Sequence, residues 1–352
     1  MNPLDPLPEI DLRHLARLTD DTGLFQHAAF GVPDLAHGYC TDDNARALIA
    51  ATEHALLRGR DEKLVPLSRY RAFLAYAFDP GTGRFRNFMG FDRRWREAHG
   101  SEDSHGRALW ALGLAVRHAP DPGVRELALR LFRGALPAVG AFTSPRAHAF
   151  ALVGLDAYLR SEPADEGRAG LRARLATRLL EGWRANASGD WPWPEDTVTY
   201  DNAKLPHALV ASGAALDDKA MRETGLASLR WLVEVQTAPA GHFSFIGNRG
   251  WMTRGGARAR FDQQPLEAFG LVHACLAAAR ATGEAAWLGE ARRAFDWFLG
   301  GNDLSLPLYD ETTGGCCDGL TPDEVNRNQG AESTLAYLLS VLEMRAHAER
   351  RP

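Results

Sequence analysis

Apolar residues recur three and four positions apart along most of the chain, the spacing that predicts amphipathic α-helices. Segments with charged outer positions predict outer helices, near residues 9–18, 62–78, 122–139, 165–186, 217–237 and 284–299. They alternate with segments richer in Ala, Leu and Gly, which predict inner helices, near residues 42–58, 102–118, 145–160, 201–215, 263–281 and 329–346. Weakly alternating runs predict short strands or hairpin loops at residues 83–88, 190–193 and 241–246.

This alternation predicts an all-α fold, an (α/α)6 toroid in which six outer helices surround six inner ones. A helical hairpin cannot bury its apolar face alone, and closing a ring of hairpins removes the exposed ends of an open array. No linker divides the sequence, so we expect one domain over residues 1–352 with a short N-terminal lead. The amino ends of the inner helices should then share one rim, where short strands or loops cover a cleft.

The charge balance excludes some functions. The chain has 45 acidic and 40 basic residues, a formal net charge of -5, and neither sign forms a block. A surface for nucleic acid or an anionic membrane would need a basic stripe, so neither partner is expected. No targeting segment is visible, which predicts a cytoplasmic protein. The four cysteines form no C-x-x-C pair, which predicts neither a zinc site nor a disulfide framework, and no motif indicates a cofactor.

Carboxylates are concentrated at the polar starts of the inner segments and in one loop. Acids in a first helical turn are stabilised by the helix dipole by about 0.3–1 kcal/mol, so each alone could serve its helix, with Thr41 and Ser101 as N-caps. Together they suit glycoside hydrolysis, which needs two carboxyl groups about 5–5.5 Å apart for retention or about 6.5–9.5 Å apart for inversion. The candidate catalytic residues are Glu195, Asp43, Asp103, Asp201 and Glu332.

For three of these acids, the residues that lie next to them in the chain suggest a role. Glu195 is the expected general acid, because Trp193 and Pro194 beside it would exclude water and favour its protonated form. Asp43 and Asp103 are the expected base or nucleophile, because an arginine follows each of them on the same helical face and would keep it ionised. The other two candidates are held in reserve.

Aromatic and polar side chains near these acids indicate a carbohydrate substrate, an oligosaccharide or glycoside. Indole faces stack on the C–H faces of sugars, and amide, guanidinium and imidazole groups hydrogen-bond to sugar hydroxyls. The tryptophans could equally anchor loops to the helices. The candidate substrate-binding residues are Asp42, Asn44, Arg46, Glu102, His105, Arg107, Trp191, Trp193, His207, Arg249, Trp251, Gln263, Gln264, Asn328 and Gln329.

Four strings carry a resemblance to a known family, at residues 37–46 (HGYCTDDNAR), 102–107 (EDSHGR), 200–206 (YDNAKLP) and 326–334 (NRNQGAEST). Over residues 21–338 the chain resembles bacterial proteins often labelled "glycosyltransferase" and found beside sugar-processing genes. A nucleotide-sugar glycosyltransferase of the usual kind has paired Rossmann-like domains, whereas this chain lacks βα alternation and a Gly-rich phosphate turn. The six-hairpin glycosidase superfamily is the better architectural match, and the resemblance supplies no catalytic assignment.

Three other functions fit parts of the sequence. A sugar epimerase or isomerase would use paired histidines as acid and base, with candidates at His37, His105, His148, His207 and His242. A phosphorylase would combine one carboxylate with a phosphate cradle, with candidates at Arg249, Arg254, Gly255, Gly256, Arg258 and Arg260. A non-catalytic carbohydrate-binding toroid would keep the tryptophans without needing the acids.

A bound metal is not expected. Asp42, Asp43 and Asp103 could surround a divalent cation, but their spacing matches no recognised ligand pattern.

Overall fold

The computed structural model describes residue 4 and residues 6–59, 66–119 and 121–349. The inner helices are α2 (Thr41–Arg58), α4 (Glu102–Arg117), α6 (Pro145–Ser161), α8 (Lys204–Ala215), α10 (Pro265–Thr282) and α12 (Ala331–Glu349). The outer helices are α1 (Arg13–Leu18), α3 (Leu67–Ala77), α5 (Pro122–Ala135), α7 (Glu166–Asn186), α9 (Lys219–Val235) and α11 (Ala286–Asp296).

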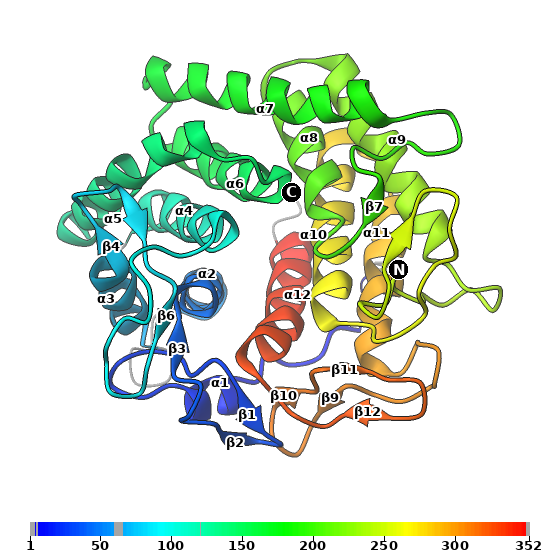
Figure 1. Ribbon diagram of the computed structural model, residues 1–352, viewed down its shortest axis with the longest axis horizontal. Helices are drawn as coiled ribbons and strands as arrows, with labels where there is room; N and C mark the ends of the chain where they lie inside the picture. Colours follow the sequence, from blue (N-terminus) through cyan, green and yellow to red (C-terminus); the bar gives the residue numbers. More distant parts are fainter. Residues whose placement is uncertain (1–3, 5, 60–65, 120, 350–352) are drawn as a thin grey trace.

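These helices form two concentric rings, seen end-on in Figure 1. Each inner helix contacts the next inner helix along the chain, and α12 contacts α2, so the inner ring closes. The outer helices pack against the inner ones in pairs, with α3 on α2, α5 on α4, α7 on α6, α9 on α8, α11 on α10 and α1 on α12. The predicted (α/α)6 toroid is therefore confirmed.

The helices begin and end near the predicted positions, with a few differences. The segment near 122–139 divides into α5 and a 3-10 helix, η1 (Leu136–Ala141), and a second 3-10 helix, η2 (Trp297–Leu299), follows α11. The segment near 201–215 becomes helical only at Lys204, because Asp201 has a left-handed backbone with a φ of 44°. Residues 62–65 of the predicted segment 62–78 lie outside the described residues.

Burial explains why the inner segments carry few charges. In α10, every residue from 265 to 279 is buried, because neighbouring helices surround it. The outer helix α7 instead buries a single stripe, which runs from Leu175 to Trp183, and leaves its charged face in solvent. None of the helices in the described part of the chain is both long and apolar enough to cross a lipid bilayer.

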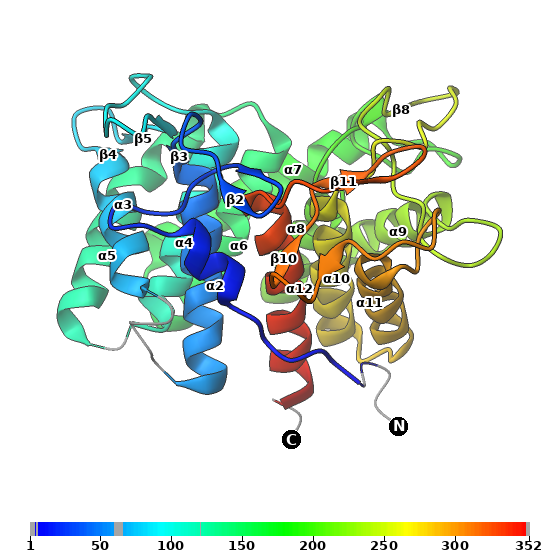
Figure 2. The same cartoon turned by 90° about the horizontal axis from the view of Figure 1, so that it is seen from below.

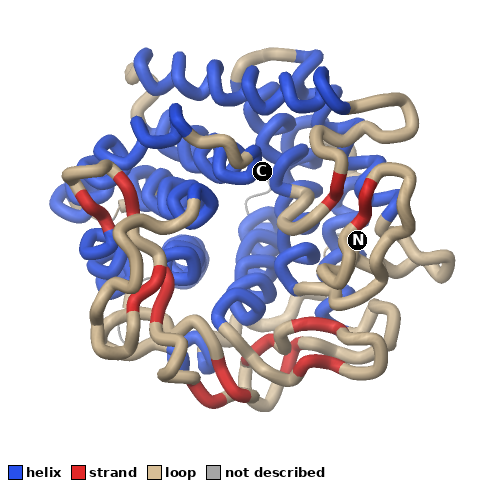
Figure 3. The backbone as a smooth tube through the Cα atoms, in the orientation of Figure 1, coloured by secondary structure: helices blue, strands red, loops and turns tan. Residues whose placement is uncertain are grey.

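The long connections from outer to inner helices carry short strands, which gather at one end of the toroid in Figure 2 and are red in Figure 3. The strands form antiparallel pairs: β1 (Ala28–Ala29) with β2 (Val32–Pro33), β3 (Tyr39–Cys40) with β6 (Phe88–Met89), β4 (Phe78–Asp79) with β5 (Arg84–Phe85), β7 (Thr197–Val198) with β8 (Met252–Thr253), β9 (Tyr309–Asp310) with β10 (Gly315–Cys316), and β11 (Gly319–Leu320) with β12 (Val325–Asn326). Of the three runs predicted as strands or hairpin loops, residues 83–88 include strand, whereas residues 190–193 and 241–246 are loops.

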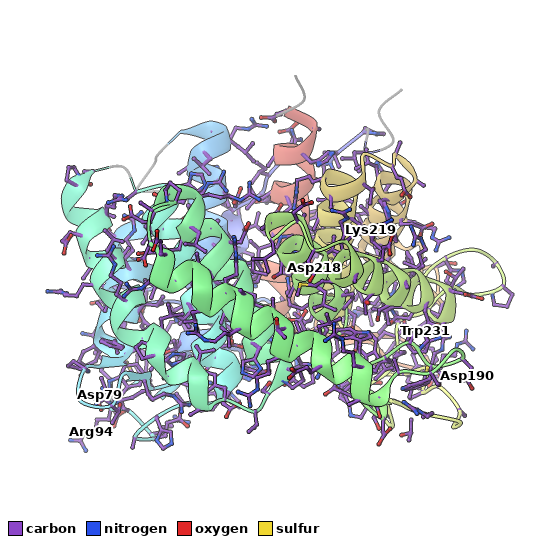
Figure 4. The ribbon with its side chains drawn as sticks, turned by 90° about the horizontal axis from the view of Figure 1, so that it is seen from above. Asp79, Arg94, Asp190, Asp218, Lys219 and Trp231 are labelled. Carbon is purple, nitrogen blue, oxygen red and sulfur yellow. The ribbon has the colours of Figure 1, made fainter. Side chains whose placement is uncertain are left out.

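At the other end, the connections that the structure describes in full are short turns, between α6 and α7, α8 and α9, and α10 and α11. In Figure 4, Asp79, Arg94 and Asp190, which lie in outer-to-inner connections, are near the lower edge of the molecule. Asp218 and Lys219, which lie where α8 turns into α9, are clearly higher in the same view. The amino ends of the inner helices therefore meet beneath the long connections.

Helices α4 and α6 approach each other closely through glycines. A Cβ atom added to Gly113 would lie 2.1 Å from the carbonyl oxygen of Gly154, and one added to Gly154 would lie 2.5 Å from the carbonyl oxygen of Leu109. Both obstructing atoms belong to the backbone, so no side-chain rotation can relieve the clash. Glycine at these two positions allows the inner ring to close tightly on this side.

Replacing Gly113 with alanine is therefore expected to destabilise the fold. Because the added methyl group must push α4 away from α6, Gly113→Ala should lower the free energy of unfolding by about 1–3 kcal/mol or more. Chemical denaturation followed by far-UV circular dichroism measures this change.

A matched control is available on the outer ring. A Cβ atom added to Gly289, in the middle of α11, meets no atom within 4 Å. Gly289→Ala should therefore leave stability unchanged or raise it by about 0.5–1 kcal/mol, since alanine favours a helix interior over glycine. Equal effects of the two substitutions would contradict the close approach of α4 and α6.

Candidate functional site

A cavity of about 330 Å³ opens where the inner helices begin. Its walls come from the first turns of α2 and α12 and from the long connections above them. The lining is mostly polar, with carboxylates, amides and hydroxyls, and it consists of Gln26, His27, Cys40, Asp42, Asp43, Asn87, Phe88, Asn248, Asp262, Gln264, Asp318, Gly319, Thr321, Asn326, Gly330, Glu332 and Ser333.

Arg46 holds three carboxylates together at the floor of this cavity. Its Nη1 donates to Asp42 Oδ2 and to Asp43 Oδ1, each at 2.9 Å, and its Nη2 donates to Glu332 Oε2 at 2.8 Å. The arginine side chain is only 2% exposed, so the ion pairs are shielded from water on the protein side. Because Glu332 opens α12 and the two aspartates open α2, Arg46 links the last inner helix to the first.

A second buried arginine extends the network to the middle of the ring. Arg107, on α4, donates from Nη1 to both oxygens of Asp42 at 2.8 and 2.9 Å. Its Nη2 lies 3.4 Å from Asp201 Oδ2, and its guanidinium stacks over the ring of Phe150 at 4.2 Å. Arg107 therefore pairs with Asp42 and Asp201 rather than with Asp103, the residue predicted from the sequence.

The pKa values of the two adjacent aspartates of α2 shift in opposite directions. Burial opposes ionisation of Asp42, but the charges of Arg107 and Arg46 outweigh it and lower its pKa. Burial raises the pKa of Asp43 to about 7; Arg46 opposes this shift, and the negative charges of Asp42 and Glu332 add to it. The expectation that an arginine keeps Asp43 ionised is therefore wrong, because burial and two neighbouring acids exceed the effect of one cation.

Cys40 supports both the helix and Asp43. It is the N-cap of α2, with Sγ accepting from the backbone N–H of Asp43, whereas Thr41, the predicted cap, is the first helical residue. The thiol also donates to Asp43 Oδ2 at 3.0 Å. Burial raises the pKa of this thiol well above its usual value, so it remains an S–H donor.

Asp318 and Asp262 are lining acids that the sequence analysis missed. Burial raises the pKa of Asp318 to about 6, although it accepts from the backbone N–H of Gly330 at 2.8 Å. Asp262 accepts from Arg249 at 3.0 Å, and its Oδ1 is buried without a hydrogen-bond partner among the described residues. Both lie in loops before an inner helix, as Glu195 does, so a wider search for loop acids would have found them.

Asp201 lies below the cavity instead of lining it. Its backbone N–H donates to Glu267, which also accepts from the Asn202 side chain at 2.9 Å. Burial raises the pKa of Glu267 to about 7, and the charge of Asp201 adds to this shift. These contacts fix the turn that precedes α8, which is a structural task.

Glu102 and Asp103, at the start of α4, bind the neighbouring segments. Glu102 Oε2 accepts from the backbone N–H groups of Thr143 and Ser144 at 2.8 and 2.7 Å. Asp103 accepts from the Ser144 hydroxyl at 2.7 Å and from the Tyr200 hydroxyl. Neither residue lines the cavity, so the structure does not bring Asp103 together with Asp43.

Glu195 has different surroundings from those predicted, and the nearby tryptophans take the second of their two expected roles. Both oxygens of Glu195 accept from Arg146 Nη1, at 3.0 and 2.8 Å, so a cation faces the predicted general acid. Trp191 and Trp193 are buried against Trp231, with ring centroids 5.1 and 5.9 Å from it. They anchor the loop, and their faces are not available to stack on a sugar.

Several candidate substrate-binding residues support the fold away from the cavity. Asn44 binds the backbone of Leu24, and buried Gln263 binds Trp297. The remaining members of this group also lie outside the lining, and they are His105, His207, Trp251, Asn328 and Gln329. Of the candidate set, Asp42 and Gln264 line the cavity, while Arg46 and Arg107 bind its acids and Arg249 binds Asp262.

The histidines proposed for an epimerase do not form one pair at the cavity. His105 is fully buried, and burial lowers its pKa to about 4. His148 is buried as well, and His242 pairs with Asp303 at 3.1 Å. His37 is exposed, but its ring contacts that of His27 at 4.6 Å, and His27, which the sequence analysis missed, lines the cavity.

The arginines proposed for a phosphate cradle do not converge on the cavity. Arg254 binds the carbonyl of Asn186, Arg258 binds the carbonyl of Ser244 and Arg260 pairs with Asp303. Each of them therefore holds a loop, and none is part of the cavity lining in the described residues.

A metal ion would compete with Arg46 for the three carboxylates at the floor of the cavity. Asp42, Asp43 and Glu332 each place one oxygen within 4.8 Å of the others, a spacing that could hold a cation. Arg46 already donates to all three, so the guanidinium supplies the positive charge that a metal would bring. Asp103, the predicted third ligand, is not in this group.

No protein-family model and no curated protein sequence matches this chain. Solved structures share the fold. A sugar epimerase from a ruminal bacterium has a TM-score of 0.74 at 12% identity, covering 99% of this chain and 98% of the other. A cellobiose 2-epimerase from Bacillus thermoamylovorans has a TM-score of 0.73 at 14% identity, covering 99% and 97%. The resemblance to proteins labelled "glycosyltransferase" gains no support, whereas the six-hairpin architecture is shared.

A third similar structure belongs to a hydrolase. It is an α-1,6-mannanase from Salegentibacter sp., with a TM-score of 0.65 at 11% identity, covering 96% of each chain. That structure contains α-1,6-mannotetrose and an inactive variant in which two consecutive aspartates are replaced by alanine. At these identities the likeness establishes the fold alone.

Removing the cation at the floor is expected to cost considerable stability. Arg46→Met leaves three clustered carboxylates without their common partner, so the free energy of unfolding at pH 8 should fall by about 3–5 kcal/mol. The loss should be smaller at pH 5, because carboxylates that lack Arg46 bind protons more readily in the folded state than in the unfolded state. Urea unfolding at the two pH values measures both quantities.

The control is an ion pair between an arginine and a glutamate on the protein surface. Arg58 binds Glu349 at 3.0 Å, and both side chains are more than a third exposed. Arg58→Met should change stability by less than about 1 kcal/mol, with little dependence on pH. If Arg46→Met lowered the free energy of unfolding as little as Arg58→Met does, then Arg46 would not be neutralising the three carboxylates.

Proposed function

We propose that this protein is a glycoside hydrolase in which Asp43 donates a proton and Glu332 acts on the anomeric carbon. The single observation that carries the proposal is the pair itself. Asp43 and Glu332 line one cavity, share one guanidinium and have oxygens within 4.8 Å of each other, while burial raises the pKa of Asp43 to about 7. A carboxyl group that keeps its proton near neutral pH can protonate a leaving glycosidic oxygen.

Glu332 suits the second role better than Asp42 does. Its side chain is 39% exposed, and only its Oε2 is bound by Arg46, so Oε1 can face a substrate in the cavity. Asp42 instead accepts from two buried arginines, whose charges lower its pKa and make it a weaker nucleophile. Asp42 therefore acts as a fixed negative charge that helps to keep the proton on Asp43.

The short separation favours retention of configuration. Retaining glycosidases place their carboxyl groups about 5–5.5 Å apart, whereas inverting enzymes leave about 6.5–9.5 Å for a water molecule. In this mechanism Glu332 attacks the anomeric carbon as Asp43 protonates the departing oxygen. Asp43 then takes a proton from water, and that water releases the sugar from Glu332.

The lining fits a polyhydroxylated ligand. Amide side chains at Gln26, Asn87, Asn248 and Asn326 can each donate to and accept from sugar hydroxyls. Phe88, 39% exposed, provides the aromatic surface that was expected from the tryptophans. The structurally similar α-1,6-mannanase, inactive when two consecutive aspartates are replaced, adds support, because consecutive aspartates also open α2.

A sugar epimerase is the second candidate, and His27 is the observation that favours it. His27 lines the cavity in contact with His37, and burial lowers its pKa, so that it is neutral and able to accept a proton. Two of the structurally similar proteins are sugar epimerases. In that reaction His27 would remove a proton from a sugar carbon, and no glycosidic bond would break.

Removing either carboxyl group should abolish hydrolysis without unfolding the protein. Asp43→Asn and Glu332→Gln are each expected to lower kcat on the best glycoside of a broad oligosaccharide panel by about 100-fold to 10,000-fold. Reducing-end release measures turnover, and thermal unfolding confirms that the variants fold.

Asp196→Asn is the matched control, since its side chain is 77% exposed in a neighbouring loop and should retain full activity. If both Asp43→Asn and Glu332→Gln still hydrolyse the glycoside, the proposed mechanism is wrong. Exchange of solvent deuterium into a free sugar, lost in His27→Asn, would replace it with the epimerase. Cleavage that requires inorganic phosphate would replace it with a phosphorylase.

The rate should fall as the pH rises, because the proton donor must be protonated. With the pKa of Asp43 raised to about 7, kcat/KM is expected to drop tenfold per pH unit above that value. The Cys40 thiol favours the ionised form of Asp43 by donating to it, so Cys40→Ala should move this falling limb to higher pH.

Cys40→Ser keeps a hydrogen-bond donor at this position. The falling limb of the pH–rate profile should therefore stay near its original pH. The test compares pH–rate profiles of the native protein, Cys40→Ala and Cys40→Ser. A rate that increases above pH 8, or a limb that Cys40→Ala leaves unmoved, would show that Asp43 is not the proton donor.

A further inference from the structure

A second cavity, of about 420 Å³, lies at the opposite end of the toroid. Each inner helix contributes to it, mainly from its second half, so it occupies the axis of the ring beneath the long-connection rim. Alanines leave much of this space open, and charged groups surround its mouth. The lining consists of Glu53, Trp110, Leu114, Arg117, Val153, Asp156, Ala157, Arg160, His207, Ala211, Ala214, Ala215, His273, Ala277, Arg280, Ala281 and Glu343.

The lower cavity is separate from the acidic floor described above. Lys204 is fully buried between them, with Nζ 3.1 Å from His273 Nδ1 and 4.3 Å from the centroid of Trp110. No residue lines both cavities. A ligand in the lower cavity would therefore not touch Asp43 or Glu332.

His207 is a buried polar group that lacks a partner. It lines the lower cavity with only 3% of its surface exposed, and its ring packs against that of His273 at 4.3 Å. Nδ1 is buried and has no hydrogen-bond partner among the residues that the structure describes. Both nitrogens of His273, in contrast, are engaged, by Lys204 and by Glu343 at 3.3 Å. The protein therefore leaves part of the hydrogen-bonding capacity of His207 unused.

The charge around His207 is positive. Lys204 and Arg280 both act on its ring and lower its pKa, after the larger effect of burial. Arg280 stands at the exposed end of α10, and no carboxylate in the described ranges lies within ion-pair distance of it. The acids of the lining face other partners, as Asp156 binds Arg160 at 2.9 Å and Glu343 binds His273.

We propose that the lower cavity binds a small molecule that carries an oxyanion, a phosphate or a carboxylate, between Arg280 and His207. A guanidinium recognises the planar or tetrahedral oxygens of such a group through paired N–H donors. The imidazole of His207 supplies a further N–H, and buried Lys204 adds a positive charge below it. The alanine walls accommodate the remainder of the ligand.

This site does not depend on the proposed hydrolase activity. Binding at the lower cavity is measured without any turnover, so the two proposals can fail separately. The lining comes from all the inner helices and the proposed contacts join α8 to α10, so a ligand bound here would stabilise the closed ring.

Isothermal titration of the full chain with inorganic phosphate, and in parallel with succinate, tests the proposal. One of these two anions is expected to bind at a single site, and the tighter one identifies the source of the oxyanion. Arg280→Ala should weaken that binding by about tenfold or more, since a hydrogen bond to a charged group is lost. His207→Asn, which shortens the side chain, should weaken it as well.

Arg174→Ala, an exposed arginine on outer helix α7, is the matched control and should bind as the native protein does. Asp43→Asn should also bind normally, which separates the lower site from the upper cavity. If neither anion binds, or if Arg280→Ala binds as tightly as the native chain, the proposed oxyanion site is wrong. Thermal unfolding shows that Arg280→Ala is folded, so a loss of binding reports on the site.

Discussion

The candidate site depends on one arginine that is surrounded by acids. Arg46 allows Asp42, Asp43 and Glu332 to lie within 4.8 Å of one another at the end of a closely packed ring. Without a shared cation, these charges would repel each other where burial limits screening by water. The neutralisation is incomplete, because three acids face one guanidinium and Arg107 compensates mainly Asp42. Burial is the main reason that Asp43 holds a proton, and the remaining negative charge adds to it.

The fold could be predicted from the sequence because its determinants are local and repeated. Alternation of charged and uncharged amphipathic segments distinguishes outer from inner helices, and the polar start of each inner segment marks the rim. Asp43, Arg46 and Glu332 were found in this way, since they occupy first turns that a closed ring must bring together. Predictions failed where the backbone departs from a regular helix, as at Asp201 with its left-handed φ.

The details of the site were less predictable because they depend on contacts between distant segments. Trp193 looks like a sugar platform in the sequence, but the fold buries it against another tryptophan. The residues beside Glu195 predict a carboxyl group shielded from water, yet Arg146 reaches it from α6. Asp318 has no helical periodicity to mark it, since it lies in a loop whose path only the folded chain defines. Burial, together with the charges of Asp42 and Glu332, outweighs Arg46 and raises the pKa of Asp43.

The position of Glu332 has a consequence for the synthesis of the chain. It lies on the last inner helix, 286 residues after Arg46, and it joins the other acids only when α12 closes against α2. A ribosome must therefore release the chain as far as α12 before the acidic centre is complete. A growing chain that has not yet released α12 lacks one of the two reactive groups, so the proposed chemistry begins only after α12 closes the ring.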